Sequence, residues 1–545
     1  MNQLMLPLVF LLSPFVKWPV QMLLFPIDLY RFFSGERFVW LRYVAWAVGL
    51  FVLGYIVNAH FNPRDSFWLS ILPFVWFSGV LFFICEKLEN AREGSALAGM
   101  AFVPGTGTTL AAHNAGDSIL RGSQVVNATH LSKNGGDTAM RIGGVAIAPK
   151  AELQHFLVSG TTGAGKTQAI NAMLRTVRER EQPAIIADVG GGFLSRFLRD
   201  GDLVLNPFDA RDIGWSPFTE IRQPYDARRL ARALVPDTEG PGGEWRTFAQ
   251  SLLGELLRSQ WEKGEHSVRR IYELFMSGEH GELAEVAKGT AASVMFHDGN
   301  EKMLNNTRAT AGPFLDVWQY LPDDGKFSVR DYVRAAAEEG FSGWLYLTYR
   351  DDQVALMRNL VGAWLDLAVV EGLSLGDNDD RRLWYVMDEL DSLGKVTNLK
   401  EGLTKLRKKG GVCVSGIQTI SQLRTTYGHD LAQTMLGNMN NRLVMRASDG
   451  ETAGYFEKEL GQQEIKRWAT NEGTSQQTMQ MGNTQSDGRS EQRTVQSTVL
   501  ASEIATLPDL HGYLTTPGSP IYQVKVEYVG MPQVAEAYEP QGAFA

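Results

Sequence analysis

A glycine-rich segment of eight residues constrains the fold of this chain more than any other feature of its sequence. It reads Gly160-Thr161-Thr162-Gly163-Ala164-Gly165-Lys166-Thr167 and matches the Walker A pattern in full. The apolar run 155–158 before it predicts a buried strand, and apolar residues at helical spacing follow it from Ile170 to Val177. A simple glycine-rich turn is the alternative, but it leaves the flanking strand and helix patterns unexplained.

The segment predicts a site for ATP, because each of its parts has a physical role at a phosphate. The glycines let the backbone curl so that its N–H groups point at phosphate oxygens, and the dipole of the following helix adds to their effect. Lys166 is expected to reach the β- and γ-phosphates, and the Thr167 hydroxyl to ligate Mg²⁺. All eight residues are therefore candidate nucleotide ligands.

A second apolar run, 383–387, ends in the carboxylates Asp388 and Glu389. Downstream of a complete Walker A segment, this pattern predicts a Walker B strand. Asp388 is then expected to hold Mg²⁺, through water or through Thr167, and Glu389 to polarise the attacking water as a general base. The alternative is an Asp-Glu pair at a strand end that is merely exposed to solvent.

Two further residues are candidates for catalytic roles. Gln418 ends the next strand-like run, and because neighbouring parallel strands finish at one edge, it is expected to sense the γ-phosphate or orient water. A polar cap of the strand is its alternative role. The basic run 405–409 is usually a solvated face, but Arg407 in it is our candidate for a cation supplied across a subunit interface. Arg442 and Arg446 are the competing choices.

The N-terminal region predicts a transmembrane helical hairpin over 38–85. Residues 43–63 and 66–85 are two uncharged, largely apolar runs, each about as long as a membrane-spanning helix. The alternative is a buried core hairpin. The flanking cations gather on one side: Arg31, Arg37 and Arg42 precede the first run, Lys87 and Arg92 follow the second, and Arg64 alone lies in the tip. This excess predicts that both ends of the hairpin are cytoplasmic, so we expect a multi-pass membrane protein whose remaining chain is cytoplasmic.

The remaining segments follow from composition and periodicity. Residues 1–30 are apolar but interrupted by prolines, which predicts an interfacial or partly inserted membrane segment. We expect a connector at 86–119, a first part of the nucleotide-binding domain at 120–225, an all-α domain at 226–335 and a second part of the nucleotide-binding domain at 336–545. Within the last, residues 471–498 are rich in Gln, Ser, Thr, Gly and Asn, which predicts a flexible loop.

Apolar runs at 184–188, 344–348 and 412–416 predict further strands, and strand-helix-strand order predicts an α/β fold with a parallel sheet. Helical spacing recurs at 226–235, 245–263 and 268–277. The net charge of −9 excludes the global basic field of many DNA-binding proteins, so any DNA would be held by local basic residues. The two cysteines are too far apart to form a metal-binding pair.

Several segments carry a family resemblance. They are Ile185-Ile186-Ala187-Asp188-Val189-Gly190-Gly191, Asn206-Pro207-Phe208-Asp209 with Trp215-Ser216-Pro217-Phe218, Asp388-Glu389-Leu390-Asp391-Ser392-Leu393, Thr404-Lys405-Leu406-Arg407-Lys408-Lys409-Gly410, and Gly416 to Leu423. With the Walker pair and Gln418, they make the chain resemble the TraD-type coupling proteins of type IV secretion and conjugation, within the FtsK/HerA group of ring motors. The resemblance covers nearly everything from residue 30 onward.

The resemblance implies a RecA-like P-loop ATPase domain with an inserted all-α domain, a homohexameric ring and ATP-driven handling of single-stranded DNA. It also implies a relaxase or relaxosome and the inner-membrane components of a type IV secretion system as partners, and it places the family's trans-acting arginine at Arg407. Two other functions stay open: a docking receptor for protein substrates without DNA pumping, and a chromosome-type FtsK/HerA DNA translocase.

Overall fold

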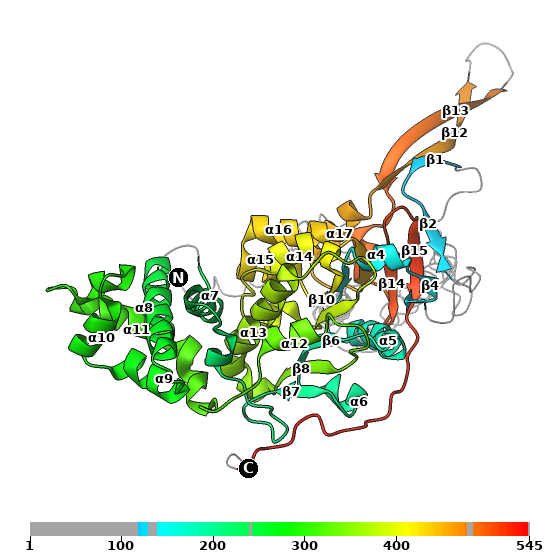
Figure 1. The fold of residues 1–545 in the computed structure, drawn as a ribbon. Coiled ribbons are helices and arrows are strands. Elements are labelled where there is room, and N and C mark those ends of the chain that lie inside the picture. Colours follow the sequence, from blue (N-terminus) through cyan, green and yellow to red (C-terminus); the bar gives the residue numbers. More distant parts are fainter. Residues whose placement is uncertain (1–117, 129–138, 239–241, 477–482, 543–545) are drawn as a thin grey trace, which may run out of the picture. The chain divides into compact units, whose positions relative to one another are not determined.

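The computed structural model describes residues 118–128, 139–238, 242–476 and 483–542 (Figure 1). The predicted segment 1–30, the predicted hairpin 38–85 and nearly all of the predicted connector 86–119 lie outside these residues. The centre of the described part is a ten-stranded mixed sheet with the strand order β2-β15-β14-β11-β5-β10-β9-β6-β8-β7. The predicted α/β class is confirmed by this sheet and the helices that cover it.

Seven neighbouring strands, from β11 to β7, run parallel, and β14 joins them antiparallel to β11. The strands predicted before the Walker A loop, at 184–188, at 344–348, at 383–387 and at 412–416 are all present. The strands of the sheet are β2 Val125–Asn127, β5 Phe156–Ser159, β6 Ala184–Val189, β7 Leu203–Leu205, β8 Trp344–Tyr349, β9 Leu383–Met387, β10 Gly411–Ile417, β11 Asn441–Met445, β14 His511–Thr515 and β15 Ile521–Lys525.

Both faces of the sheet are buried, which explains why its strands read as continuous apolar runs. Along β6, Ile185 and Ala187 belong to the core on one face, and Ala184 and Ile186 belong to the core on the other. The second core contains α5 (Lys166–Glu179), α6 (Leu194–Phe197) and the hairpin of β3 (Arg141–Ile142) and β4 (Val145–Ala146).

The opposite face is covered by α13 and the helices that follow it (Figure 1). The stretch Asp351–Ser374, which contains α13, is the one described helix long and apolar enough to cross a membrane. Most of it is buried against the sheet, so it is a core helix of the fold. Besides α5 and α6, the α-helices described outside the β7–β8 segment are α4 Pro149–Glu152, α13 Val354–Ser374, α14 Leu399–Lys405, α15 Ile420–Tyr427, α16 His429–Asn438, α17 Gly450–Glu459 and α18 Ala501–Ala505.

The regular secondary structure that is described between β7 and β8 consists of helices joined by loops. The helices predicted at 226–235, 245–263 and 268–277 are confirmed as α7, α8 and α9. Their apolar residues, at a period near 3.6, pack into the same core as α13. The helices are η2 Pro217–Glu220, α7 Pro224–Leu234, α8 Gly243–Glu262, α9 Val268–Ser277, α10 His280–Ala287, η3 Ala291–Phe296, α11 Glu301–Leu315, η4 Asp316–Tyr320 and α12 Val329–Ala335.

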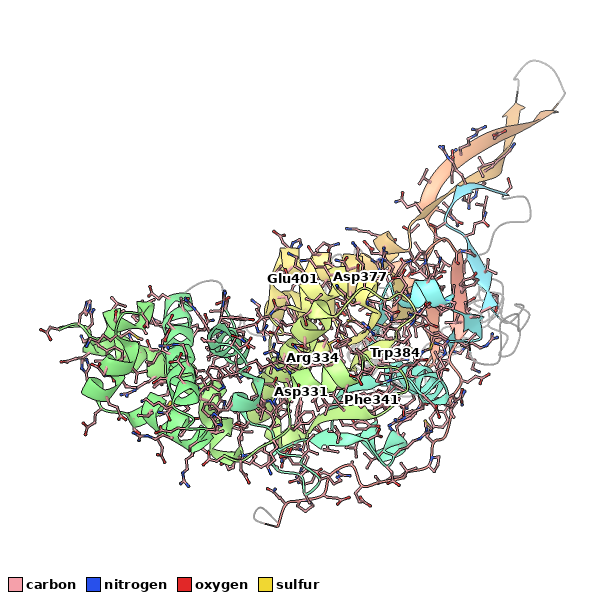
Figure 2. The ribbon with its side chains drawn as sticks, in the orientation of Figure 1. Asp331, Arg334, Phe341, Asp377, Trp384 and Glu401 are labelled. Atoms are coloured by element: carbon pink, nitrogen blue, oxygen red, sulfur yellow. The ribbon has the colours of Figure 1, made fainter. Side chains whose placement is uncertain are left out.

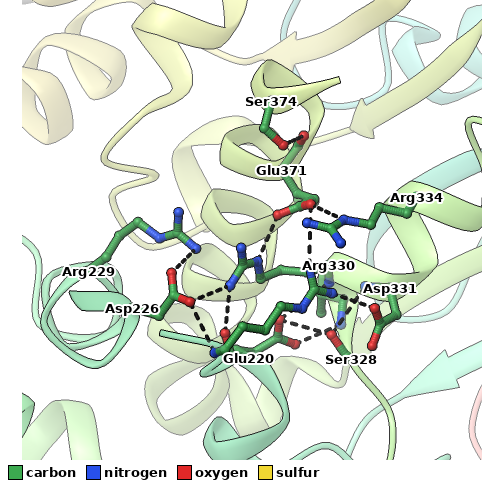
Figure 3. Close-up of polar contacts among 12 residues, drawn as sticks. Glu220, Asp226, Arg229, Ser328, Arg330, Asp331, Arg334, Glu371 and Ser374 are labelled. Atoms are coloured by element: carbon green, nitrogen blue, oxygen red, sulfur yellow. Dashed lines mark hydrogen bonds and ion pairs between the residues drawn. The ribbon is translucent and has the colours of Figure 1, made fainter. Parts of the chain in front are cut away.

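A buried network of charges ties this helical segment to α13 (Figure 3). The Arg330 guanidinium on α12 lies 3.1 Å from Asp226 on α7 and 2.7 Å from Glu371 on α13. It also donates to the Glu220 carbonyl at 2.8 Å. Arg334, labelled in Figure 2, pairs with Glu371 from the half-exposed rim. Removing one of these partners would leave the others buried without compensation, so the junction is sensitive to substitution at Arg330.

The prediction of a flexible loop at 471–498 is wrong where the structure describes this segment. β12 (Gln462–Gln476) and β13 (Asn483–Ser497) pair antiparallel in continuous register, and β1 (Ser118–Gly122) pairs with β12. The prediction rested on the lack of apolar residues for a core. Cross-strand pairing satisfies the backbone of a polar ribbon without one, so composition alone did not distinguish ribbon from loop.

Candidate nucleotide-binding site

The Walker A loop joins β5, a central strand of the sheet, to α5. Its entry is held by two neighbouring strand ends: the Gly160 N–H donates to the Ile417 carbonyl at 3.2 Å and the Thr161 N–H to the Arg446 carbonyl at 2.8 Å. Gly165 has a φ of +111°, and a Cβ there would lie 2.6 Å from Leu510 Cδ2. Both its conformation and its surroundings therefore require glycine at this position.

The Lys166 ammonium lies inside the curve of the loop and donates to the Gly160 carbonyl at 2.7 Å. Burial lowers the pKa of Lys166, and the carboxylates of Asp388, Glu389 and Asp391 oppose this effect. The lysine thus stands between the loop backbone and three acids, where it can exchange a carbonyl for a phosphate oxygen.

Asp388 and Thr167 meet across the pocket. The Thr167 hydroxyl donates to Asp388 Oδ2 at 3.1 Å, which brings together the two residues predicted to hold Mg²⁺. Burial raises the pKa of Asp388 to about 6, against the hydrogen bond from Thr167 and the charge of Lys166. Oδ1 of Asp388 is buried and has no hydrogen-bond partner among the described residues. A hydroxyl beside a carboxylate oxygen without a partner is a donor set that fits Mg²⁺.

Gln418 connects the Walker B residue Glu389 to Thr162 in the Walker A loop. Its Nε2 donates to Glu389 Oε1, and its Oε1 accepts a hydrogen bond from the Thr162 hydroxyl at 3.4 Å. Gln418 follows β10 and Glu389 follows β9, so the parallel register of these strands places them together. The predicted general base and the predicted sensor are therefore in direct contact.

These residues line one pocket of about 510 Å³ at the carboxyl edge of the sheet. Its lining also contains Asp509, Leu510 and Tyr528, which sequence reasoning missed. No local pattern marks them. Asp509 and Leu510 reach the site because β14 pairs with β11, next to the P-loop strand, and Tyr528 follows β15, which pairs with β14. Asp391 is not among the lining residues, but its charge acts on Lys166, and sequence reasoning gave it no role either. Burial raises the pKa of Asp391 to about 6.

The three candidate arginines occupy different places. Arg446 follows β11 beside the loop, and its guanidinium lies 2.6 Å from Asp509. Arg442 is held by Glu459 and by the carbonyls of Met439 and Leu436. Arg407 is exposed in η7 (Leu406–Lys409), before the amino end of β10, whereas the pocket lies at its carboxyl end. A strand of seven residues spans roughly 20 Å, so Arg407 does not reach the pocket of its own chain.

Known proteins resemble this chain over most of its described part. Escherichia coli (strain K12) coupling protein TraD is 29% identical over 417 residues, which are 75% of this chain and 58% of that protein. Agrobacterium fabrum VirD4 is 26% identical over 350 residues, 58% of this chain and 51% of VirD4. The chain thus spans about half the length of the curated relatives it matches.

Solved structures of the plasmid coupling protein TrwB have the same fold. The complex of TrwB with ADP and Mg²⁺ is 32% identical, with a TM-score of 0.69 over 78% of this chain and 98% of that one. The complex with the ATP analogue ADPNP is 31% identical, with the same TM-score and coverage. Residues 139–527 also match the family described as the type IV secretion-system coupling protein DNA-binding domain. The chain therefore belongs to this family of type IV secretion coupling proteins.

Proposed function

We propose that this chain is an ATP-hydrolysing coupling protein that helps move single-stranded DNA into a type IV secretion channel during conjugation. The observation that carries the proposal is the convergence of Lys166, Thr167, Asp388, Glu389 and Gln418 on one pocket. The complexes of TrwB with ADP and Mg²⁺ and with ADPNP support ATP and Mg²⁺ as the ligands.

Each side chain has a task that its contacts support. Mg²⁺ held by Thr167 and Asp388 would neutralise charge on the β- and γ-phosphates. Lys166 leaves the Gly160 carbonyl for a phosphate oxygen. Glu389 accepts a proton from the attacking water.

Gln418 ties the position of Glu389 to that of Thr162 in the loop. A change at the γ-phosphate is therefore passed to β10 through this side chain. This link gives Gln418 the role of a sensor that reports hydrolysis to the sheet.

The assembly that we propose is a homohexamer in the bacterial inner membrane, with the motor in the cytoplasm. Arg407 is exposed and remote from the pocket of its own chain, which supports it as our candidate for the cation that enters the pocket of a neighbouring subunit. The proposed architecture is a RecA-like motor with the helices of 226–335 as an inserted domain. A relaxase or relaxosome and inner-membrane secretion components are the proposed protein partners.

The test is ATP hydrolysis by the full chain in detergent or nanodiscs, with and without a single-stranded oligonucleotide. Lys166→Ala should lower turnover at least about a hundredfold, because a donor to the transferring phosphoryl group is lost. Lys288→Ala, an exposed lysine after α10, is the matched control and should keep wild-type turnover. Equal turnover in Lys166→Ala and wild type would contradict the assignment of this pocket as the site of ATP hydrolysis. Hydrolysis that ignores DNA would favour the docking-receptor function instead.

A further inference from the structure

One turn of the chain, residues 235–238 after α7, collects cations from three separate elements. Arg232 on α7 lies 3.1 Å from the Asp237 carboxylate. Lys395, in the segment after β9, donates to the Asp237 carbonyl at 3.1 Å. Arg246 on α8 donates to the Pro236 carbonyl at 3.0 Å. Residues about 160 positions apart in the sequence therefore bring positive charge to a single place.

Two further arginines extend this cluster. Arg228 is exposed on α7, one turn before Arg232. Arg358 is exposed on α13, and its carbonyl accepts the N–H of Gly394, the neighbour of Lys395. We call the set Arg228, Arg232, Arg246, Arg358 and Lys395 the junction patch. Asp237 is the one carboxylate in the contacts just given. The five cations of the patch therefore outnumber the acidic groups in these contacts.

The chemistry of the junction patch suits the backbone of an unpaired nucleic acid strand. Arg228 and Arg232 keep guanidinium donors toward solvent, and phosphates are the anions that such donors bind best. Tyr225 is 68% exposed and precedes Arg228 by three residues on α7, which places both on one side of the helix. An exposed ring beside cations offers a stacking surface for an unpaired base. Because the chain as a whole has a net charge of −9, DNA would bind to a local cationic surface such as this one.

We propose that the junction patch binds the phosphate backbone of single-stranded DNA and transmits its presence to the hydrolysis site. This inference rests on the proposed function, because it assumes that the pocket hydrolyses ATP. The occupant is single-stranded DNA because the patch presents both guanidinium donors and an exposed aromatic ring.

The path to the pocket is short and stiff. Lys395 follows Glu389 by six residues, and the segment between them folds into η6 (Leu390–Ser392). The Ser392 hydroxyl and N–H both donate to the Glu389 carbonyl, at 2.8 and 3.1 Å. A Cβ on Gly394 would lie 2.8 Å from the Arg358 carbonyl, so the segment packs directly on α13. A displacement of Lys395 on DNA binding would therefore also move the backbone that carries Glu389.

The experiment measures binding of a fluorescein-labelled 20-nucleotide oligo(dT) to the full chain in nanodiscs, across a salt series. The double variant Arg232→Ala/Lys395→Ala should weaken binding about tenfold and reduce the slope of log K against log salt by about 1.4, two phosphate contacts' worth. The stimulation of ATP hydrolysis by the oligonucleotide should be reduced in this double variant along with its affinity. The charge-preserving variant Arg232→Lys/Lys395→Arg should keep most of both effects, which a purely structural role of these side chains would not predict.

Lys263→Ala is the matched control, because Lys263 is exposed at the far end of α8, about 25 Å from Arg246 along the helix. It should keep wild-type affinity and salt slope. Should the alanine pair fail to fold by thermal melting, Arg232→Gln/Lys395→Gln takes its place, since it removes charge but keeps side-chain length.

The possible failures are distinguishable. If the neutralised variants keep wild-type affinity and salt slope while wild-type hydrolysis responds to DNA, the junction patch is not the DNA-binding surface. The proposed function is then unaffected. A wild type that neither binds the oligonucleotide nor responds to it overturns both. Retained DNA binding with lost binding of a relaxase protein would make the patch a protein-docking surface and also overturn the inference.

Discussion

Asp388 and Glu389 are adjacent residues with different surroundings. Asp388 is buried, carries a raised pKa and receives the Thr167 hydroxyl, whereas Glu389 receives the Gln418 amide at the pocket wall. A carboxylate beside a hydroxyl suits a cation, and a carboxylate oriented by an amide suits a base for water. These different environments support the separate roles that we propose for the two neighbouring acids.

Glu389→Gln tests this separation. The amide keeps the size of the side chain but cannot accept a proton, so kcat should fall about 10²- to 10⁴-fold. Binding of a fluorescent ATP analogue with Mg²⁺ should stay within about threefold of wild type, because Lys166, Thr167 and Asp388 are unchanged. Steady-state hydrolysis and a binding titration measure the two quantities. A variant that hydrolyses ATP normally would remove Glu389 from the role of base.

His155 makes a second prediction at the scale of one residue. It is buried, its Nδ1 accepts the Cys413 N–H at 3.0 Å, and its φ is +60°. Burial, with help from the nearby charge of Arg407, lowers the pKa of His155 to about 4. Unfolding exposes an ordinary histidine that protonates below about pH 6.5. The contribution of His155 to stability is therefore full above that pH and is lost as the pH falls toward 4, by up to about 3 kcal/mol.

In His155→Asn, the amide oxygen can replace Nδ1 as acceptor, and asparagine tolerates a positive φ. As the pH drops from 7 to 4.5, the unfolding free energy of the wild type should fall more than that of the variant. Urea unfolding at several pH values measures it. A difference that does not change with pH would show that His155 is not neutral in the folded protein.

At the scale of elements, strand order explains how the site forms. β5, β10 and β9 are neighbours and parallel, so the loop after β5 meets the loops after β9 and β10, although more than 200 residues separate it from them. The sequence could predict these strands, because burial on both faces leaves continuous apolar runs. It could also predict Gln418 beside Glu389, because parallel strands end at one edge.

Other parts of the site could not be read from local pattern. Asp509 reaches the pocket through the pairing of β14 with β11, and Tyr528 through the pairing of β15 with β14, neither of which any periodicity encodes. The ribbon of β12 and β13 was missed because polar strands without a core resemble loops in composition. The distance of Arg407 from its own pocket follows from η7 lying before β10, at the opposite edge from the phosphate loop.

The junction between α7, α12 and α13 predicts a large stability effect. Arg330→Met should destabilise the motor by about 3–5 kcal/mol, because it leaves Asp226 and Glu371 buried without their shared partner. Arg270→Ala is the control; it breaks an ion pair with Glu282 that is about half exposed, and should cost less than about 1 kcal/mol. Denaturant unfolding compares the two. Equal small losses would mean that water reaches the network.

At the scale of the whole molecule, our proposal adds to the pocket a cation that a neighbouring subunit supplies at the γ-phosphate. The exposed Arg407 is our proposal for that cation, and mixed rings can test it. Arg407→Ala and Glu389→Gln subunits should each be inactive alone, because every pocket lacks one group. When they are mixed, some pockets combine a normal Glu389 with a normal Arg407, so activity should reappear. A mixture no more active than its components would place the arginine elsewhere.

The most direct test of the account is ATP hydrolysis by the full chain across a protein concentration series, with and without single-stranded DNA. Our account predicts that activity per subunit rises with concentration and rises further with DNA, because each site is shared between subunits and linked to the strand. Hydrolysis that is strong, independent of concentration and indifferent to DNA would contradict it, and would leave a nucleotide-binding docking receptor in place of a DNA motor.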